Sequence, residues 1–527
     1  MNTLLLSCVF FLSPSSSFLL QATKTTDAVK KFEREFRSTA QKPKTPDQRS
    51  KALDLLVGID LPAVAVALSN AYLSVELEIL ALDERRTAAV EALARMVKGQ
   101  EFTDRSFETG AMASYKQLRA QVASFDRTIE RLHGLEAAIL ARAGELKETP
   151  TLIALIEHAF GDKTLPFHFK RSAVQMGTAL GEPLVAPLEK ALATCKEPQE
   201  AVLLLEGLGT IGRPARSAAE RVLGFLSHSD PAVREQAAFA LSQMAVPSAI
   251  SPLIDQLAQE PEGITQKRVA AALEVLTRRP LGSDVEAWKR WYTDEGFKLA
   301  AGEGALGGGI SSLEKSLMAD PKVARGGYYH GIPQDGRSIV YVIDCSGSMV
   351  VSATNPRYDG KVPVDAGKES RMEACKAALV GALGKLPSDC RFNIVCFNDL
   401  PHLYAAAMQE AKPAEIKKAR QWVENLEGAS TTNIHDAMQK AFEMAGRGTI
   451  DKYYRSAVDT IFLLTDGTPT TTDGEPDSKE RVLEALRRWN STQSVIIHTI
   501  GIGKHIDEPF LRQIAREHGG RFVQHFQ

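Results

Sequence analysis

The sequence lacks a surplus of charge of either sign. Its 527 residues include 63 Lys and Arg and 65 Asp and Glu, which gives a net charge of −2. Proteins that bind the phosphates of nucleic acids or an anionic membrane surface usually present clustered basic residues. We therefore expect no nucleic acid partner.

The sequence also lacks the short motifs that mark common enzyme sites. It contains no H-E-x-x-H, no P-loop, no G-x-S-x-G, and no G-x-G-x-x-G on a strand-helix turn. We therefore expect a protein that is not an enzyme, with no catalytic residue and no residue that binds an organic cofactor.

Cysteine is scarce and scattered. The six cysteines form no C-x-x-C pair, so neither a zinc site nor a thioredoxin-like motif is indicated. Cys345 and Cys396 lie near the carboxyl ends of strands that we expect to be neighbours, where a disulfide is geometrically conceivable. We favour buried free thiols at both positions.

Long apolar runs are missing beyond the N-terminus. Residues 1–22 are apolar and serine-rich, and they predict a signal peptide cleaved after Ala22, although no Lys or Arg precedes Lys24. We expect export to a periplasm or secretion, or a cytoplasmic protein if no cleavage occurs. No later segment approaches eighteen uninterrupted apolar residues, so we expect no transmembrane segment in the mature chain.

Helical patterns dominate the first half of the mature chain. An N-terminal helical segment is expected over 23–60. Residues 61–150 then carry apolar residues alternating by three and four, with Arg86 interrupting: Leu68, Tyr72, Val75, Ile79, Leu82, Ala89, Leu93 and Met96, then Tyr115, Leu118, Val122, Phe125, Ile129, Leu132, Ile139 and Leu146. This spacing predicts an antiparallel coiled-coil hairpin. Its second helix either packs on the next domain or binds an external partner.

Residues 151–296 contain an internal repeat. Aligning Met176, Leu208, Leu241 and Leu273 gives periods of 32, 33 and 32 residues, each within an alanine-rich helix that a second helix follows. Such spacing predicts a solenoid with an extended surface for a second protein partner. The segment resembles HEAT repeats, with Asp230, Pro231 and Arg234 at the inter-helix turn. We expect Trp288 to help cap the stack, and a glycine-rich linker over 297–335 to let the flanking modules orient independently.

A possible metal turn follows the linker. The run VYVIDCSGSM, residues 340–349, begins with an apolar stretch that predicts a buried strand, and Asp344, Ser346 and Ser348 follow at alternate positions directly after it. Small oxygen ligands on a tight turn suit Mg²⁺, which prefers octahedral oxygen coordination. Two later segments add oxygen ligands: GASTTNI, which contains Thr432 at the start of a helix, and TIFLLTDG, which ends a strand at Asp466.

Together these segments resemble the von Willebrand factor type A domain with a complete metal-ion-dependent adhesion site, over residues 336–527. The resemblance assigns metal-coordinating roles to Asp344, Ser346, Ser348, Thr432 and Asp466. It implies that Mg²⁺, or Mn²⁺ or Ca²⁺, is held mainly by the hydroxyls, with the aspartates mostly acting through water. It also implies that a partner's Asp or Glu carboxylate completes the coordination.

The rest of this region alternates strands and helices, which favours a doubly wound parallel sheet with ligands at its carboxyl edge. We expect strands at 338–343, 391–397, 402–407, 458–464, 495–500 and 521–524, and helices at 371–386, 414–426, 434–445, 478–489 and 508–518. The fold class is thus multidomain: an all-α half, coiled-coil hairpin plus HEAT-like solenoid, and a C-terminal α/β domain.

Two features depart from the resemblance. A loop over 351–370, with Asn355, Arg357, Tyr358 and Asp359, separates the metal turn from its helix and is expected at the rim of the site. The sequence ends just past the last expected strand, so we expect the C-terminal helix that switches affinity in integrin-type domains to be absent.

Four further acidic or basic positions are explained without a role in chemistry. His435 and Asp436 are adjacent on a helix and point in different directions, so we favour helix-surface positions over an acid/base pair. Asp473 and Asp477 are expected to be solvated at the rim.

The first functional hypothesis is an exported, non-enzymatic scaffold or adhesion protein that binds a partner through a divalent metal. One alternative is an RNA-binding protein, because the architecture resembles that of the Ro ribonucleoprotein. Another is a cytoplasmic partner of an AAA+ ATPase, as in chelatase-type families.

Overall fold

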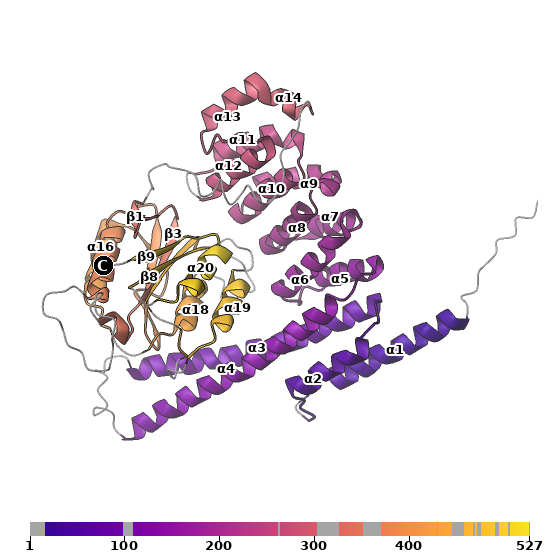
Figure 1. The fold of residues 1–527 in the computed structure, drawn as a ribbon, viewed down its shortest axis with the longest axis horizontal. Helices are drawn as coiled ribbons and strands as arrows, with labels where there is room; N and C mark the ends of the chain where they lie inside the picture. Colours follow the sequence, from indigo (N-terminus) through magenta and orange to yellow (C-terminus); the bar gives the residue numbers. More distant parts are fainter. Residues whose placement is uncertain are drawn as a thin grey trace, which may run out of the picture.

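The computed structural model describes residues 16–39, 41–97, 109–261, 264–302, 326–350, 370–428, 431–444, 458–466, 469–471, 476–490, 495–503 and 506–525. An all-helical N-terminal region is followed by a C-terminal α/β domain. Figure 1 shows this domain in the angle between a long helical hairpin and a solenoid of shorter helices. Both predicted fold classes are confirmed, while the predicted domain boundaries stay predictions.

The chain opens with a small helical unit. Helix α1 (Ser16–Phe36) packs on α2 (Pro46–Ala52) and the 3-10 helix η1 (Leu53–Leu56). Thr45 begins α2 with a capping box, in which its hydroxyl accepts from the Gln48 amide. Helix α1 runs through Ala22 without a break, and its described buried side chains lie after that residue: Val29, Phe32 and Phe36.

Two long helices form the hairpin. Helices α3 (Pro62–Val97) and α4 (Thr109–Ala143) lie side by side and run in opposite directions (Figure 1). Within the described residues, one segment, Pro62–Met96 of α3, is long and apolar enough to cross a membrane by length and composition alone. Its apolar window is 56% buried inside the protein, as in a core helix. The coiled-coil supercoil stays a prediction.

The solenoid stacks helices in antiparallel pairs beyond the hairpin (Figure 1). Three of the aligned repeat positions, Leu208, Leu241 and Leu273, are fully buried in alternate helices. A Cβ on Gly209 would lie 3.1 Å from the Ala240 Cα, so glycine lets α8 and α10 approach closely. The helices are α5 (Thr149–Gly161), α6 (Phe167–Gly177), α7 (Val185–Thr194), α8 (Pro198–Ile211), α9 (Ala219–Gly224), α10 (Pro231–Gln243), α11 (Ile250–Gln259), α12 (Ile264–Thr277), α13 (Val285–Trp291) and α14 (Phe297–Ala300).

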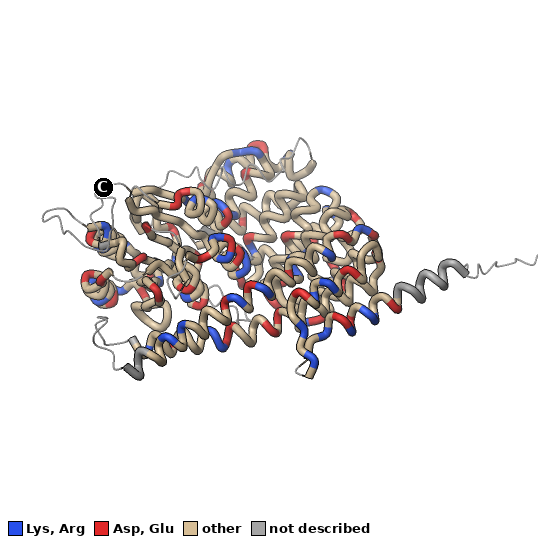
Figure 2. The backbone as a smooth tube through the Cα atoms, turned by 60° about the horizontal axis from the view of Figure 1, so that its bottom comes forward, with Lys and Arg blue, Asp and Glu red and all other residues tan. Residues whose placement is uncertain are grey.

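The inter-helix turn of the repeat is held by polar contacts. Asp230 caps α10 by accepting from the Ala232 amide at 2.8 Å. Arg234 donates to both carboxylate oxygens of Glu260, at 2.5 and 2.8 Å, and to the His228 carbonyl at 2.9 Å. These contacts tie α10 to the end of α11. Figure 2 shows Lys and Arg interspersed with Asp and Glu along the hairpin and solenoid, with no continuous basic stripe on the described helices.

The α/β domain is built on a mixed sheet with the strand order β5-β4-β3-β7-β8-β9, and β6 also pairs with β4. Strands β3 (Ser338–Asp344), β4 (Arg391–Phe397), β7 (Thr460–Thr465), β8 (Ile496–Ile502) and β9 (Phe522–His525) are parallel. Strands β5 (Pro401–Leu403) and β6 (Gln409–Glu410) pair antiparallel with β4. The hairpin of β1 (Tyr328–Tyr329) and β2 (Ile332–Pro333) precedes the sheet.

Helices cover both faces of the sheet, which explains why its central strands are almost wholly apolar. Helices α16 (Arg371–Leu383) and α17 (Pro413–Glu424) bury one face, and α18 (Ile434–Met444), α19 (Lys479–Trp489) and α20 (Glu508–Glu517) bury the other. The strand predicted at 402–407 is β5, which is antiparallel to β4 and shorter than expected. Its pairing with β4 ends at Leu403, and the Tyr404 amide then bonds the Ile394 carbonyl.

The α/β domain does not orient independently of the helical region, contrary to our expectation. Arg86 of α3 is buried against it and donates to Asp436 of α18 at 2.6 Å and to Asp126 of α4 at 2.6 Å. Arg481 of α19 also reaches Asp126, at 3.0 Å. A smaller apolar cluster joins the hairpin to Leu400, between β4 and β5. We call this set of contacts the ionic seam.

The ionic seam also corrects the expectation for His435 and Asp436. Both side chains are buried, because the hairpin covers the helix face that we expected to be exposed. The His435 Nδ1 lies 2.9 Å from the Asp436 Oδ1, and Asn433 donates to the other Asp436 oxygen at 2.9 Å. The pair therefore belongs to the contact between modules.

Candidate metal site

Neighbouring strands bring two aspartates to one edge of the sheet. Strands β3 and β7 are paired in parallel with Ile343 opposite Leu464, so Asp344 and Asp466 follow at the same carboxyl edge. Asp344 is fully buried, and its carboxylate accepts from the Ser346 amide at 2.8 Å and from the Thr465 hydroxyl at 2.5 Å. These bonds fix the start of the turn.

The two serines link the aspartates across the turn. The Ser346 Oγ lies 3.0 Å from the Ser348 Oγ, and Ser348 donates to the Asp466 Oδ1 at 2.7 Å. Ser346 and Asp466 are buried, while Ser348 is half-buried. Four of the five predicted residues are thus joined by one continuous set of hydrogen bonds.

The spacing of these oxygens fits a small divalent cation. Adjacent ligands of an octahedral Mg²⁺, bound at about 2.1 Å, are separated by about 3.0 Å. The two hydroxyl contacts of 3.0 and 2.7 Å lie close to this separation. The donor set of hydroxyl and carboxylate oxygens is also the type that Mg²⁺ prefers.

Thr432, the fifth predicted residue, is placed by a separate pair of bonds. Its amide donates to the Thr470 hydroxyl at 2.8 Å, and its carbonyl accepts from the Thr470 amide at 2.8 Å. Thr470 follows β7 and Asp466, so these bonds hold the segment before α18 beside the β7 edge. Thr432 is buried, and among the described residues its side chain makes no hydrogen bond to the other four predicted residues.

Arg371 is a site residue that the sequence pattern did not reveal. It is the first residue of α16, which Ser370 caps, and its Nη1 donates to the Asp466 Oδ2. Its side chain is 11% exposed and that of Asp466 is 0% exposed. The one feature of the sequence that could have revealed Arg371 is its place at the start of the helix after the metal turn. Residues 351–369 separate it from Ser348, so the sequence spacing did not indicate that the two are close.

The two carboxylates influence each other. Burial and the neighbouring Asp466 carboxylate together raise the pKa of Asp344 to about 7. A buried pair of like charges needs a compensating cation, and Arg371 provides one positive charge.

Cys345 and Cys396 form a disulfide, which corrects our preference for free thiols. Cys345 directly follows the end of β3, its amide bonds the Phe397 carbonyl at 2.7 Å, and Cys396 lies in the neighbouring β4. The two Cα atoms are 6.0 Å apart, which is within the range that a disulfide spans. The metal turn is therefore joined covalently to β4 between Asp344 and Ser346.

The rim of the site is only partly described. The loop residues Asn355, Arg357, Tyr358 and Asp359, and also Asp473, lie outside the described residues. Asp477 is not solvated as expected. Its carboxylate is 2% exposed and pairs with Arg481 at 2.6 Å.

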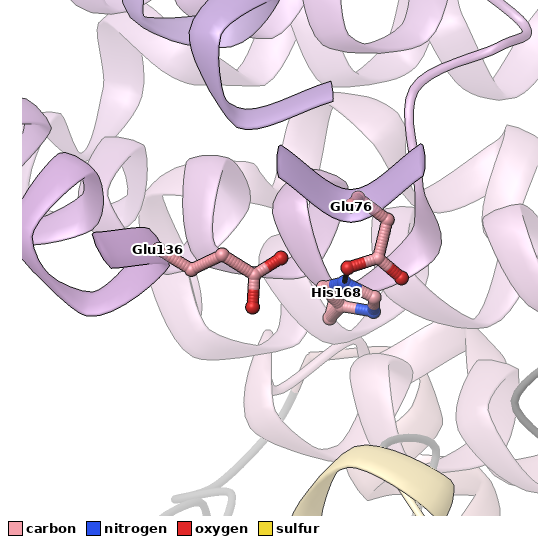
Figure 3. A group of neighbouring side chains, drawn as sticks. All are labelled: Glu76, Glu136 and His168. Carbon is pink, nitrogen blue, oxygen red and sulfur yellow. Dashed lines mark ion pairs between the residues drawn. The ribbon is translucent and has the colours of Figure 1, made fainter. Parts of the chain in front are cut away.

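A second cluster of possible ligands lies away from this edge. Glu76, Glu136 and His168 offer ligand atoms within 4.8 Å of one another, and their side chains point toward a common space (Figure 3). They line a cleft of 2110 Å³ between the hairpin, the first repeats and α19.

A cation from the α/β domain already enters this second cluster. The Arg488 Nη2 lies 2.5 Å from Glu136 and 3.4 Å from both Glu76 and His168. Burial and the carboxylate of Glu76 raise the pKa of Glu136, despite the nearby guanidinium. We therefore assign the cluster to the ionic seam and not to a metal.

Comparisons with known proteins agree with this architecture. Residues 363–523 match the sequence profile of the von Willebrand factor type A domain, and residues 185–274 match that of HEAT repeats. The inter-alpha-trypsin inhibitor heavy chain H3 of Mus musculus is 26% identical over 217 residues, which cover 40% of this chain and 22% of that protein. Heavy chain H4 of Sus scrofa is 28% identical over 187 residues, which cover 35% and 18%. The chain thus spans about a fifth of the length of these curated relatives.

Solved structures give more distant likenesses. A von Willebrand factor type A protein from Catenulispora acidiphila has a TM-score of 0.28 at 20% identity, covering 36% of this chain and 39% of that chain. The PilB minor pilin from Streptococcus sanguinis has a TM-score of 0.28 at 16% identity, covering 37% and 59%. On the sequence profiles and the fold together, the chain carries a von Willebrand factor type A domain preceded by HEAT-type helical repeats.

Proposed function

We propose that this protein is a non-enzymatic adhesion or scaffold protein that binds a protein partner through a divalent metal. Asp344, Ser346, Ser348, Thr432 and Asp466 would hold Mg²⁺, or Mn²⁺ or Ca²⁺. The bound ion would supply an electrophilic position that an Asp or Glu carboxylate of the partner completes.

One observation carries the proposal. The oxygen contacts among Ser346, Ser348 and Asp466, at 3.0 and 2.7 Å, have the spacing of adjacent ligands around a small octahedral ion. The similarity to inter-alpha-trypsin inhibitor heavy chains supports a protein-binding role over an enzymatic one.

The solenoid would present a second surface for a protein partner. Its mixed charge pattern does not favour the RNA-binding alternative, because phosphate contacts need clustered Lys and Arg (Figure 2). The ATPase-partner alternative has no specific feature to support it. We propose that the protein acts outside the cytoplasm.

Metal binding is tested by removing one hydroxyl at a time from the full-length chain. Ser346→Ala and Thr432→Ala should each weaken Mg²⁺ binding by about tenfold or more in calorimetry, since each removes a direct ligand. Both should stay folded, because the serine and threonine lie at the sheet edge.

The matched control is Ser338→Ala, at the opposite end of the same strand, which should leave Mg²⁺ affinity unchanged. Equal Mg²⁺ affinity in wild type, Ser346→Ala and Thr432→Ala would show that the site is assigned to the wrong residues.

A further inference from the structure

We propose that Arg371 is a resident counter-cation of the metal site, and that its charge makes the metal-loaded site select a partner's carboxylate. The inference rests on the metal-dependent binding proposed above. It concerns how the charge of Arg371 affects two affinities, that of the site for the ion and that of the metal-loaded site for the partner's carboxylate.

The geometry places Arg371 inside the ligand set. Asp466 uses one carboxylate oxygen to accept from Ser348 at 2.7 Å and the other to accept from the Arg371 Nη1. The guanidinium thus lies one carboxylate away from the serine hydroxyls that would hold the metal. Since Asp466 is 0% exposed, solvent screens this contact little.

The position of the guanidinium is fixed by packing. Gly503, at the end of β8, has φ of +102°, and a Cβ there would lie 3.1 Å from the Arg371 Cζ. A side chain at this position would therefore push the guanidinium away from Asp466. The Arg371 Nε is buried and has no hydrogen-bond partner among the described residues. The buried guanidinium therefore does not satisfy all its donors, and its contact with Asp466 is the interaction that compensates for its burial.

A count of charges shows the consequence. When both carboxylates are ionised, Asp344 and Asp466 together carry two negative charges, which Arg371 partly balances before an ion binds. A divalent ion adds two positive charges, so the metal-loaded site has one positive charge in excess. An Asp or Glu carboxylate of a partner restores neutrality. In a site of low dielectric constant, such an imbalance opposes the ion and favours the anionic ligand.

The two effects have opposite signs when Arg371 is neutralised. Without its charge, the ion alone balances the two aspartates, so the ion should bind more tightly. The partner's carboxylate then loses the attraction of the excess charge, so it should bind more weakly. A merely structural arginine would weaken both interactions together.

The test measures both affinities in the full-length chain. Calorimetry with Mg²⁺ alone should show that Arg371→Gln binds the ion at least about tenfold more tightly than wild type. NMR titration of the Mg²⁺-saturated protein with N-acetyl-aspartate amide should show a several-fold loss of affinity for this carboxylate probe. Arg371→Lys keeps the charge and should resemble wild type in both measurements.

Two controls separate charge from structure. Arg391→Gln removes the same charge at the start of β4, at the opposite end of the sheet, and should change neither affinity. In EDTA, Arg371→Gln should unfold at a lower temperature than wild type, because the repulsion between Asp344 and Asp466 is no longer offset, and Mg²⁺ should raise this temperature more than in wild type. Arg371→Met, which keeps the aliphatic bulk, is a second neutral variant if Arg371→Gln does not fold.

The outcomes distinguish this inference from the proposed function. If wild type binds no Mg²⁺, the metal-dependent function is wrong. If wild type binds Mg²⁺ but the neutral variants bind it equally or more weakly, Arg371 is not a counter-cation. A joint loss of ion and probe binding would likewise overturn the inference and give Arg371 a structural role.

Discussion

Two histidine side chains of the α/β domain, His498 and His518, are buried in their neutral form. The His498 ring packs on Phe462, with ring centroids 4.9 Å apart, and its Nδ1 accepts from the Arg521 amide at 2.9 Å. Burial, with the positive charge of Arg521, lowers the pKa of His498 to about 3. Burial lowers the pKa of His518 to about 4 in the same way. These residues make the fold sensitive to acid.

The stability that His498 and His518 contribute to the α/β domain should fall as the pH drops below about 6.5. In the unfolded chain a histidine takes up a proton near this pH, whereas folded His498 remains neutral until about pH 3. The stability that comes from keeping His498 neutral is therefore fully present above pH 6.5 and is lost as the pH falls from 6.5 to about 3. Thermal unfolding at pH 7.5, 6 and 5 should show a falling midpoint, and His498→Gln, which keeps an acceptor for Arg521, should reduce the fall. An identical fall in the variant would contradict this assignment.

Single residues of the site differ in how far the sequence predicts them. Asp344, Ser346 and Ser348 are adjacent along the chain, and Asp466 ends a strand whose pairing follows from parallel topology, so their proximity was predictable. The contact of Arg371 with Asp466 was not, because it depends on how the chain returns from 351–369. The disulfide was also missed, since spacing alone cannot distinguish two neighbouring thiols from a bonded pair.

At the scale of elements, the hairpin contains a charged residue that interrupts its apolar pattern and has a structural role. Arg86 interrupts an apolar stripe of α3, and in the structure it is buried between Asp126 of α4 and Asp436 of α18. The interruption is visible in the sequence, but its role was not predictable, because the partner Asp436 lies far away in the sequence. Strands and helices of the α/β domain were located to within a few residues because their periodicity is local, while the ionic seam depends on long-range packing.

Replacing Arg86 with methionine should destabilise the protein strongly. The side chains of Arg86 and Asp436 are 4% and 3% exposed, so the change leaves a buried carboxylate without its main cation. We expect a loss of about 3–5 kcal/mol in the free energy of unfolding, measured by urea denaturation.

The control is Arg85→Met on the exposed neighbouring position, which should cost less than about 0.5 kcal/mol. The double variant Arg86→Met with Asp436→Asn should recover part of the loss, because the buried charge is removed as well. A cost for Arg86→Met no larger than that for Arg85→Met would mean that the seam contributes little to stability.

At the scale of the whole molecule, the proposed export is compatible with the structure of the N-terminal helical unit. Helix α1 begins at Ser16 and continues past Ala22, but its described buried anchors Val29, Phe32 and Phe36 all follow the predicted cleavage point. Cleavage after Ala22 would therefore remove no described core contact.

We expect mass spectrometry of the native protein to find an N-terminus close to Thr23 in the periplasmic or secreted fraction. A shortened α1 should retain its packing on α2 and η1, so the cleaved and uncleaved chains should have similar unfolding midpoints. Recovery of an intact Met1 from the cytoplasm would reject export and revive the ATPase-partner alternative.

The ionic seam has a mechanical consequence for the solenoid. A stack of helical repeats can bend and stretch along its length, because each repeat contacts only its neighbours. Here the first repeats rest on the hairpin, the α/β domain is fastened to the same hairpin, and Lys267 of α12 reaches Asp335 before β3 at 2.9 Å. The solenoid is thus attached to the rest of the molecule near both ends, at the hairpin and at the α/β domain (Figure 1). A pulling force on a ligand bound to the α/β domain would therefore be transmitted to both the hairpin and the solenoid, through the ionic seam and the Lys267–Asp335 contact.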